Sequence, residues 1–254
     1  MKLRILGCGT SSGVPNLRSG WGRCDPDEPK NRRMRSSVLF ESAGERLLVD
    51  CGPDLRQQLL DAGSPMVDAL LLTHDHADHS HGIDELRPIV QTRGEPLPFL
   101  ARPDVIEQMK RRFAYAFVDL RYYAALYDPK AIENEFMVGD ARVRVVDQPH
   151  GGITSLGLRF DKGGKSIAYA IDFNEITDTM ATLYNGVDVW VADCLMLDPH
   201  PTHAHLDMVL DAAREFSVGQ LLLTHMGNGM DYATLKARLP DWAAPAHDGL
   251  EVEF

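Results

Sequence analysis

The stretch Thr73-His74-Asp75-His76-Ala77-Asp78-His79 decides how this chain is interpreted. It directly follows the continuous apolar run 69–72, a pattern typical of a buried strand. Three imidazoles and two carboxylates therefore fall within six positions at the end of a strand. A loop there can direct His74 and His76 at one point, and Asp78 and His79 at another. Such ligands suit zinc, manganese or iron, so the stretch predicts a metal-binding loop rather than a solvated polar turn.

Further candidate ligands occupy similar positions in the second half of the chain. His150 follows the alternating run 142–146, Asp172 follows an apolar run, and His225 follows the continuous apolar run 221–223. Each alone is more typical of an ordinary loop residue. Together with His74, His76, Asp78 and His79 they supply the number that two metal ions require, each at a strand end, where α/β sites gather.

Short strand-like runs alternate with turns along the chain, and helical periodicity separates several of them. The expected strands are Leu3–Leu6, Val38–Glu41, Arg46–Val49, Ala69–Thr73, Phe99–Ala101, Arg142–Val146, Leu156–Phe160, Ser166–Ala170, Val187–Ala192, Gln220–Thr224 and Leu250–Phe254. The expected helices, each starting at an aspartate that could act as N-cap, are Asp54–Ala62, Asp104–Phe113, Asp207–Phe216 and Asp231–Leu239. This order predicts two packed sheets with helices outside, in a single domain over 1–254.

Composition limits the function. The chain has 254 residues and a formal net charge of −11, which disfavours non-specific binding of long nucleic acid, because that binding depends on basic residues. A small anionic substrate is still compatible with locally placed positive charge. The first residues hold only a short apolar run, and no stretch approaches the length of a membrane span. We therefore expect a cytoplasmic protein with reduced thiols and no membrane contact.

The motif His74-x-His76-x-Asp78-His79, together with Asp50 before it and with His150, Asp172 and His225 in order after it, resembles the metallo-β-lactamase superfamily over nearly the whole chain. The resemblance implies an α/β fold, the four-layer αββα sandwich. It implies two divalent metal ions, Zn²⁺ with Mn²⁺ as the alternative. The implied ligands are His74, His76 and His150 for one ion, Asp78, His79 and His225 for the other, with Asp172 bridging and Asp50 orienting ligands through hydrogen bonds.

Within the superfamily, the chain is most similar to the phosphodiesterase branch of tRNA 3′-processing endonucleases and the phosphoribosyl cyclic phosphodiesterase of phosphonate breakdown. The similarity lies in four segments, 6–15, 193–194, 205–207 and 248–251. It implies His205 as the catalytic histidine and Asp193 as its carboxylate partner, with Asp78 also in the catalytic set. Unlike the phosphonate enzyme, the N-terminal loop has a single cysteine, Cys24, so we expect no structural zinc there.

These residues fit hydrolysis of a small or cyclic phosphodiester, nucleotide- or phosphoribosyl-like. Two metal ions can lower the pKa of a shared water, so that hydroxide attacks phosphorus. His205 would protonate the leaving oxygen, because histidine titrates near neutral pH, and Asp193 would hold its ring. The alternatives are a thioester or lactone hydrolase of the same fold, an RNA-processing endonuclease, or a metal-binding module without catalysis.

Weaker signals concern substrate binding and assembly. The basic segment 29–37 supplies candidate contacts to a substrate phosphate, namely Lys30, Arg32, Arg33, Arg35 and Ser37. For any single basic residue, a solvated face or pairing with the excess acids is the simpler interpretation. A helical and aromatic insertion is expected around 104–135; its aromatic part, 113–127, would form a lid, a base-stacking wall or the face of a homodimer.

Overall fold

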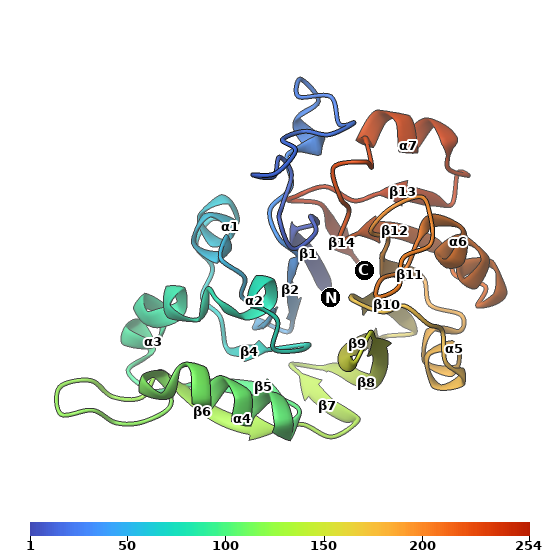
Figure 1. Ribbon diagram of the computed structural model, residues 1–254. Coiled ribbons are helices and arrows are strands. Elements are labelled where there is room, and N and C mark those ends of the chain that lie inside the picture. The colour runs from blue at the N-terminus through green and yellow to red at the C-terminus, as the bar shows by residue number, and fades with distance from the viewer.

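The computed structural model describes residues 1–254, which form two seven-stranded sheets packed face to face (Figure 1). The first sheet has the order β14-β1-β2-β3-β4-β5-β6. Its strands are β1 (Lys2–Gly7), β2 (Ser37–Ser42), β3 (Glu45–Val49), β4 (Ala69–Leu71), β5 (Leu97–Ala101), β6 (Tyr127–Ala131) and β14 (Glu251–Glu253).

The second sheet has the order β13-β12-β11-β10-β9-β8-β7. Its strands are β7 (Glu135–Val138), β8 (Ala141–His150), β9 (Ile153–Lys162), β10 (Lys165–Ala170), β11 (Val189–Asp193), β12 (Gln220–Thr224) and β13 (Ala243–Pro245). The stacked rings of Phe40 on β2 and Phe160 on β9, 4.0 Å between centroids, join the two sheets in the main core. Burial of such apolar surface is the main force that holds the sheets together.

Helices cover the outer face of each sheet (Figure 1). On the side of the first sheet lie α1 (Leu55–Asp61), α2 (Ala77–Ser80), α3 (Arg87–Arg93) and α4 (Pro103–Arg112), with the short 3₁₀ helices η2 (Ile83–Leu86) and η3 (Ala114–Ala116). A further 3₁₀ helix, η1 (Pro29–Asn31), contacts Tyr232, whose amide donates to Asn31 Oδ1 at 2.8 Å. On the side of the second lie α5 (Asp178–Tyr184), α6 (Leu206–Glu215) and α7 (Tyr232–Arg238). The four-layer αββα sandwich is therefore confirmed. No helix has both the length and the apolar composition that a transmembrane span requires.

The strand directions bring several strand ends to the same edge. β3, β4, β5 and β6 run parallel to one another, as do β10, β11, β12 and β13. β8 and β10 both pair antiparallel with β9, so β8 shares the direction of β10. Loops that follow the carboxyl ends of such strands converge, and this edge is where α/β folds place their sites.

The helices that begin near aspartates differ from the expectation in how they are capped. Asp231 caps α7 by accepting a hydrogen bond from the Thr234 amide at 2.8 Å. Asp54 precedes α1 but binds Arg35 instead of capping the helix. Sequence analysis did not identify α5, although Thr177 caps it with its hydroxyl. It also missed β6, β7 and β13, since short strands carry little periodicity of their own.

Candidate metal centre

The candidate ligands come from strand ends that meet at one edge of the two sheets. Asp50 directly follows β3, the segment 73–79 follows β4, His150 ends β8, Asp172 follows β10 and His225 follows β12. Within each sheet these strands run in the same direction, so the side chains that follow them are brought together although they lie far apart in sequence.

Asp172 lies at the centre of the cluster. Its Oδ2 is 3.2 Å from His74 Nε2 and 3.4 Å from the Nε2 atoms of His79 and His150. Its Oδ1 is 3.3 Å from His225 Nε2. A single carboxylate thus contacts histidines of two neighbouring groups, as a bridging ligand must.

Three groups of potential ligands lie close together: two are those expected from the sequence, and the third consists of Asp172, His203 and His225. Potential ligand atoms of His74, His76, His150 and Asp172 all lie within 4.8 Å of one another. The same holds for Asp78, His79 and His225, and Asp78 Oδ2 is 3.0 Å from His79 Nε2. The structure therefore brings together all seven residues proposed as ligands.

Asp50 fixes the orientation of two of the histidines, as the resemblance implied. Its Oδ1 accepts the Thr73 amide at 2.8 Å, and its Oδ2 accepts His79 Nδ1–H at 2.8 Å. The Thr73 hydroxyl donates to Asp50 and can then accept His74 Nδ1–H at 3.0 Å. Both histidines therefore carry the ring proton on Nδ1, which leaves the Nε2 lone pair free for a cation.

At two further histidines, a hydrogen-bond acceptor likewise holds the Nδ1–H group. His150 Nδ1 is 2.7 Å from the Thr202 carbonyl oxygen, which can only accept a hydrogen bond. The Ser36 hydroxyl donates to the Gly9 carbonyl, so it accepts from His225 Nδ1 at 3.1 Å. Sequence analysis missed the supporting roles of Ser36, Thr73 and Thr202, because no local pattern reveals which hydroxyl or carbonyl a distant ring will contact.

The inward-facing atoms of this cluster fit a metal centre. The Nε2 atoms of His74, His79 and His225 and the Oδ1 atom of Asp172 are buried and have no hydrogen-bond partner. Buried polar atoms without partners are rare in folded proteins. A divalent cation accepts lone pairs from imidazole and carboxylate together, so the donor set and its unsatisfied atoms both fit metal binding.

Backbone conformation directs three of these side chains. Asp50, Asp172 and His225 have φ values of 65°, 54° and 56°, in the left-handed region that non-glycine residues rarely adopt. Each is the residue at which a strand turns into its loop. Such strain is typical of functional sites, where surrounding structure holds the residue in place.

Two residues of the cluster are held in the protonation state that a metal ligand needs. Burial lowers the pKa of His150 to about 4, so this ring is neutral near pH 7. Burial alone would raise the pKa of Asp78, but the adjacent His79 holds it below its ordinary value. Both residues are thus in the state that a cation requires.

The structure pairs Asp193 with His203 and not with His205, so the expected His205–Asp193 pair is wrong. His203 Nδ1 lies 3.1 Å from Asp193 Oδ2 and 3.8 Å from Asp172 Oδ1. Burial alone would lower the pKa of His203, but the hydrogen bond to Asp193 raises it. His205 is the N-cap residue of α6, and its side chain makes no capping hydrogen bond. The sequence shows three histidines in the loop 199–206, but the path of this loop in the folded protein decides which of them contacts Asp193.

The residues proposed to hold a substrate phosphate are largely engaged within the protein. Arg33 is buried, and its guanidinium donates to the main-chain carbonyls of Met230 at 2.6 Å and Gly227 at 3.2 Å. The Ser37 hydroxyl is buried and donates to the Asp50 carbonyl at 2.9 Å. Neither side chain is free for a substrate phosphate.

The other basic candidates have partners nearer the surface. Lys30 donates to the Tyr232 hydroxyl at 3.1 Å, and Arg32 lies over the Trp21 ring at 5.1 Å. Arg35 forms an ion pair with Asp54 at 2.9 Å, and its Nε donates to the Ser11 carbonyl at 3.1 Å. Arg35 thus contacts Ser11, one of the residues that line the metal cavity.

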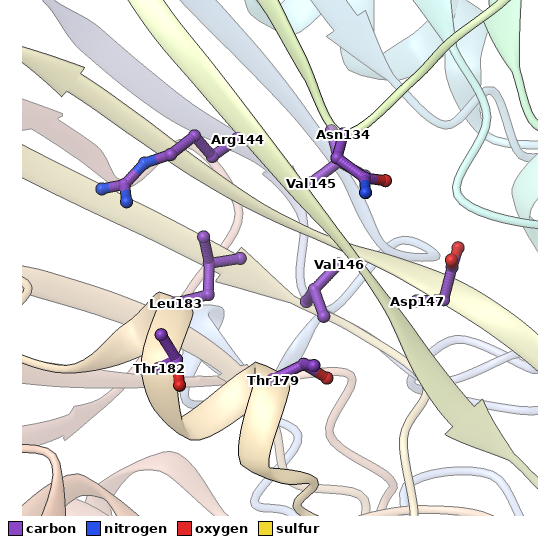
Figure 2. A pocket seen from close by; sticks show the side chains of 8 residues that line it. All are labelled: Asn134, Arg144, Val145, Val146, Asp147, Thr179, Thr182 and Leu183. Atoms are coloured by element: carbon purple, nitrogen blue, oxygen red, sulfur yellow. The ribbon is translucent and has the colours of Figure 1, made fainter.

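The candidate ligands open into a cavity of about 280 Å³. His203 and Thr202 line one side, and Gly151, Gly152 and Ile153 of the β8–β9 turn line another. Another cavity, of about 360 Å³, has no histidine in its wall (Figure 2). Its charged groups are already paired, Arg144 with Asp161 and Asp147 with Arg102. A reaction is therefore expected at the cavity lined by His76, His150, His203 and His225.

Comparisons with known proteins match most of the chain. A family model described as a beta-lactamase superfamily domain matches residues 45–226. The crystal structure of a diphosphatase from the PhnP family superposes with a TM-score of 0.91 and 32% sequence identity, covering 100% of this chain and 96% of that one.

Two curated relatives have different names and lengths. A ribonuclease Z from Mycolicibacterium gilvum is 27% identical over 233 residues, 78% of this chain and 79% of its own length. An octanoyltransferase from Porphyromonas gingivalis is 30% identical over 261 residues, 99% of this chain but 51% of that protein. The chain thus spans about half the length of the second relative.

Proposed function

Because the chain belongs to the beta-lactamase superfamily, we propose that it is a dinuclear metal-dependent phosphodiesterase acting on a small or cyclic diester. The observation that carries the proposal is the convergence of four histidines on Asp172, at 3.2–3.4 Å. The Nε2 atoms of three of them, His74, His79 and His225, and Asp172 Oδ1 are buried without a hydrogen-bond partner. The diphosphatase relative, similar over its full length, supports chemistry at phosphorus.

The proposed ligands divide between two ions. His74, His76 and His150 would hold one, Asp78, His79 and His225 would hold the other. Asp172 would contribute to both, since it lies 3.2 Å from His74 and 3.3 Å from His225. Zinc is the proposed metal and manganese the alternative, because imidazole and carboxylate suit both. When bound, the ions act as Lewis acids on the phosphoryl group and stabilise the attacking and leaving oxygens.

His203 is the proposed general acid, in place of His205. Asp193 accepts its Nδ1–H, so the Nε2 atom is the ring nitrogen available to the cavity that His203 lines. In the hydrolysis, the oxygen of water forms the new bond to phosphorus, its proton passes to solvent, and the bond to the leaving alcohol breaks. His203 donates its Nε2 proton to that alkoxide, and Asp193 stabilises the imidazolium and fixes the ring.

The proposal is tested by hydrolysis of a substrate panel by the zinc- and manganese-loaded protein. The panel holds a cyclic nucleotide, bis-p-nitrophenyl phosphate, a diphosphate diester, a precursor tRNA, a thioester and a lactone. We expect turnover of the small diesters, lost in Asp172→Asn and retained in Asp68→Asn, which removes a carboxylate at the start of β4. Turnover of only the thioester or lactone, or of only the precursor tRNA, would overturn the proposal in favour of that alternative.

A further inference from the structure

The five histidines proposed as metal ligands differ in how their rings are held. In four of them Nδ1 lies within 3.1 Å of an oxygen atom of the protein, and these are His74, His79, His150 and His225. The ring of His76 has no such contact, and His76 is the only exposed residue among the five. The direction of the His76 ring therefore depends on the main chain that carries it.

Two side chains hold the main chain at His76. The Ser80 hydroxyl, on α2, donates to the His76 carbonyl at 2.7 Å and lies 3.3 Å from the Asp75 carbonyl. Arg112, the last residue of α4, donates from Nη1 to the Asp75 carbonyl and from Nη2 to the Asp75 carboxylate. That carbonyl belongs to the peptide bond between Asp75 and His76. The guanidinium of Arg112 thus fixes the orientation of the peptide that leads into His76.

The chain around Arg112 also contacts the residues that follow the metal loop. The ring of Phe113 lies edge-on to the ring of His81, 5.4 Å between centroids. The Tyr115 hydroxyl donates to the Asp84 carboxylate. These contacts hold the end of α4 beside the segment 75–84, so the Arg112 guanidinium is presented to Asp75 from a fixed position.

The contact between Arg112 and Asp75 is suited to orienting the loop more than to stabilising the fold. The Arg112 side chain is 40% exposed, and exposed ion pairs contribute little to the free energy of unfolding. All polar contacts of Arg112 within the protein go to Asp75. Metal binding is more sensitive to such a contact, because ligand distances in metal sites vary by only about 0.2 Å.

We propose that Arg112 is a positioning residue for the ion held by His74, His76 and His150, and that it acts through the peptide between Asp75 and His76. This inference rests on the metal centre of the proposed function. His74 and His150 have their own ring contacts, so the effect of Arg112 is expected at His76.

The test is a double-mutant cycle of Arg112→Gln and His76→Gln, with zinc dissociation constants measured by competition against a chromophoric chelator. Arg112→Gln should raise the dissociation constant of one of the two ions about tenfold, the lower end of the range for residues that orient ligands. In the His76→Gln protein the same change should alter it by less than about twofold, because the ring that Arg112 positions is gone. Arg112→Lys should restore part of the loss, since an ammonium can donate to the carbonyl but lacks the planar fork.

Arg111→Gln is the matched control. Arg111 is the preceding residue of α4, is exposed and forms no ion pair, so its replacement makes the same change of charge away from the metal loop. Both zinc dissociation constants of Arg111→Gln should equal those of the wild type.

The outcomes separate this inference from the proposed function. Wild-type zinc affinities in Arg112→Gln overturn the inference, as does a loss of equal size in the His76→Gln protein. Equal weakening of both ions, with a lower melting temperature of the metal-free protein, also overturns it, because a merely structural role would give that pattern. A selective loss in a protein that hydrolyses no diester supports the role of Arg112 and refutes the phosphodiesterase. Hydrolysis of diesters, with wild-type zinc affinities in Arg112→Gln, does the reverse.

Discussion

Replacement of Asp50 by asparagine should weaken one metal ion selectively. The carboxylate now accepts from the Thr73 amide and from His79 Nδ1, each at 2.8 Å. In Asp50→Asn the amide oxygen, at the position of Oδ1, can keep both contacts to Thr73, to its amide at 2.8 Å and to its hydroxyl at 3.0 Å, so His74 stays oriented. The amide nitrogen then faces His79. His79 must accept that hydrogen bond at Nδ1, which moves its proton to Nε2 and removes it as a ligand.

The dissociation constant of the ion held with Asp78 and His225 should rise tenfold to a hundredfold, which corresponds to ~1.4–2.7 kcal/mol of binding free energy. The group formed by His74, His76, His150 and Asp172 should keep its affinity. The assay is zinc competition against a chromophoric chelator, with metal content measured by mass spectrometry. Asp68→Asn is the control, because Asp68 also accepts a main-chain amide, that of Arg46 at 2.9 Å, but no histidine. Two sites of wild-type affinity in Asp50→Asn would refute the reasoning.

Further predictions concern stability. Chelation of the metal should lower the melting temperature, since a ligand at one hundred times its dissociation constant stabilises the native state by ~2.7 kcal/mol; an unchanged melting temperature would contradict a structural contribution of the ions. Burial raises the pKa of Asp248 to about 6. Because the folded-state pKa is raised, the free energy of unfolding is highest below pH 4 and falls by on the order of 3 kcal/mol as the pH rises through 6. In urea unfolding, the free energy of unfolding of Asp248→Asn should therefore depend less on pH between 4 and 7 than that of the wild type. Arg33→Met should lower the free energy of unfolding by about 2–4 kcal/mol, because it leaves the buried carbonyls of Gly227 and Met230 without a donor, whereas Arg32→Gln at the surface should change it by less than about 0.5 kcal/mol.

The sequence predicted the parts of this protein that depend on local pattern. The buried strands that precede His74 and His225 are confirmed, because continuous apolar runs such as Leu221–Leu223 are typical of strands buried on both faces. The αββα sandwich followed from the resemblance carried by His74-x-His76-x-Asp78-His79. The candidate metal ligands converge at one edge of the sheets, because each follows the carboxyl end of a strand that reaches this edge.

What the sequence could not provide depends on the path of the chain in space. His203 and His205 differ by two positions in a proline-containing loop, and only the folded loop shows that His203 meets Asp193. The basic segment 29–37 suggested phosphate contacts, but the fold commits Arg33 and Ser37 to main-chain carbonyls. A basic residue in a sequence indicates that its side chain will bind an acceptor, but the sequence does not show whether that acceptor belongs to a substrate or to the protein itself.

The most direct test of the account compares His203→Asn with His205→Asn on diesters of different leaving groups. With methyl or sugar leaving groups, His203→Asn should lose ~10²–10⁴ in kcat, because the alkoxide departs without a proton donor. With bis-p-nitrophenyl phosphate it should lose little, since the phenolate departs unaided, and its metal content should equal that of the wild type. His205→Asn should keep near wild-type kcat on every substrate. An equal loss on good and poor leaving groups in His203→Asn, or the leaving-group dependence appearing in His205→Asn instead, would contradict the assignment of His203 as the general acid.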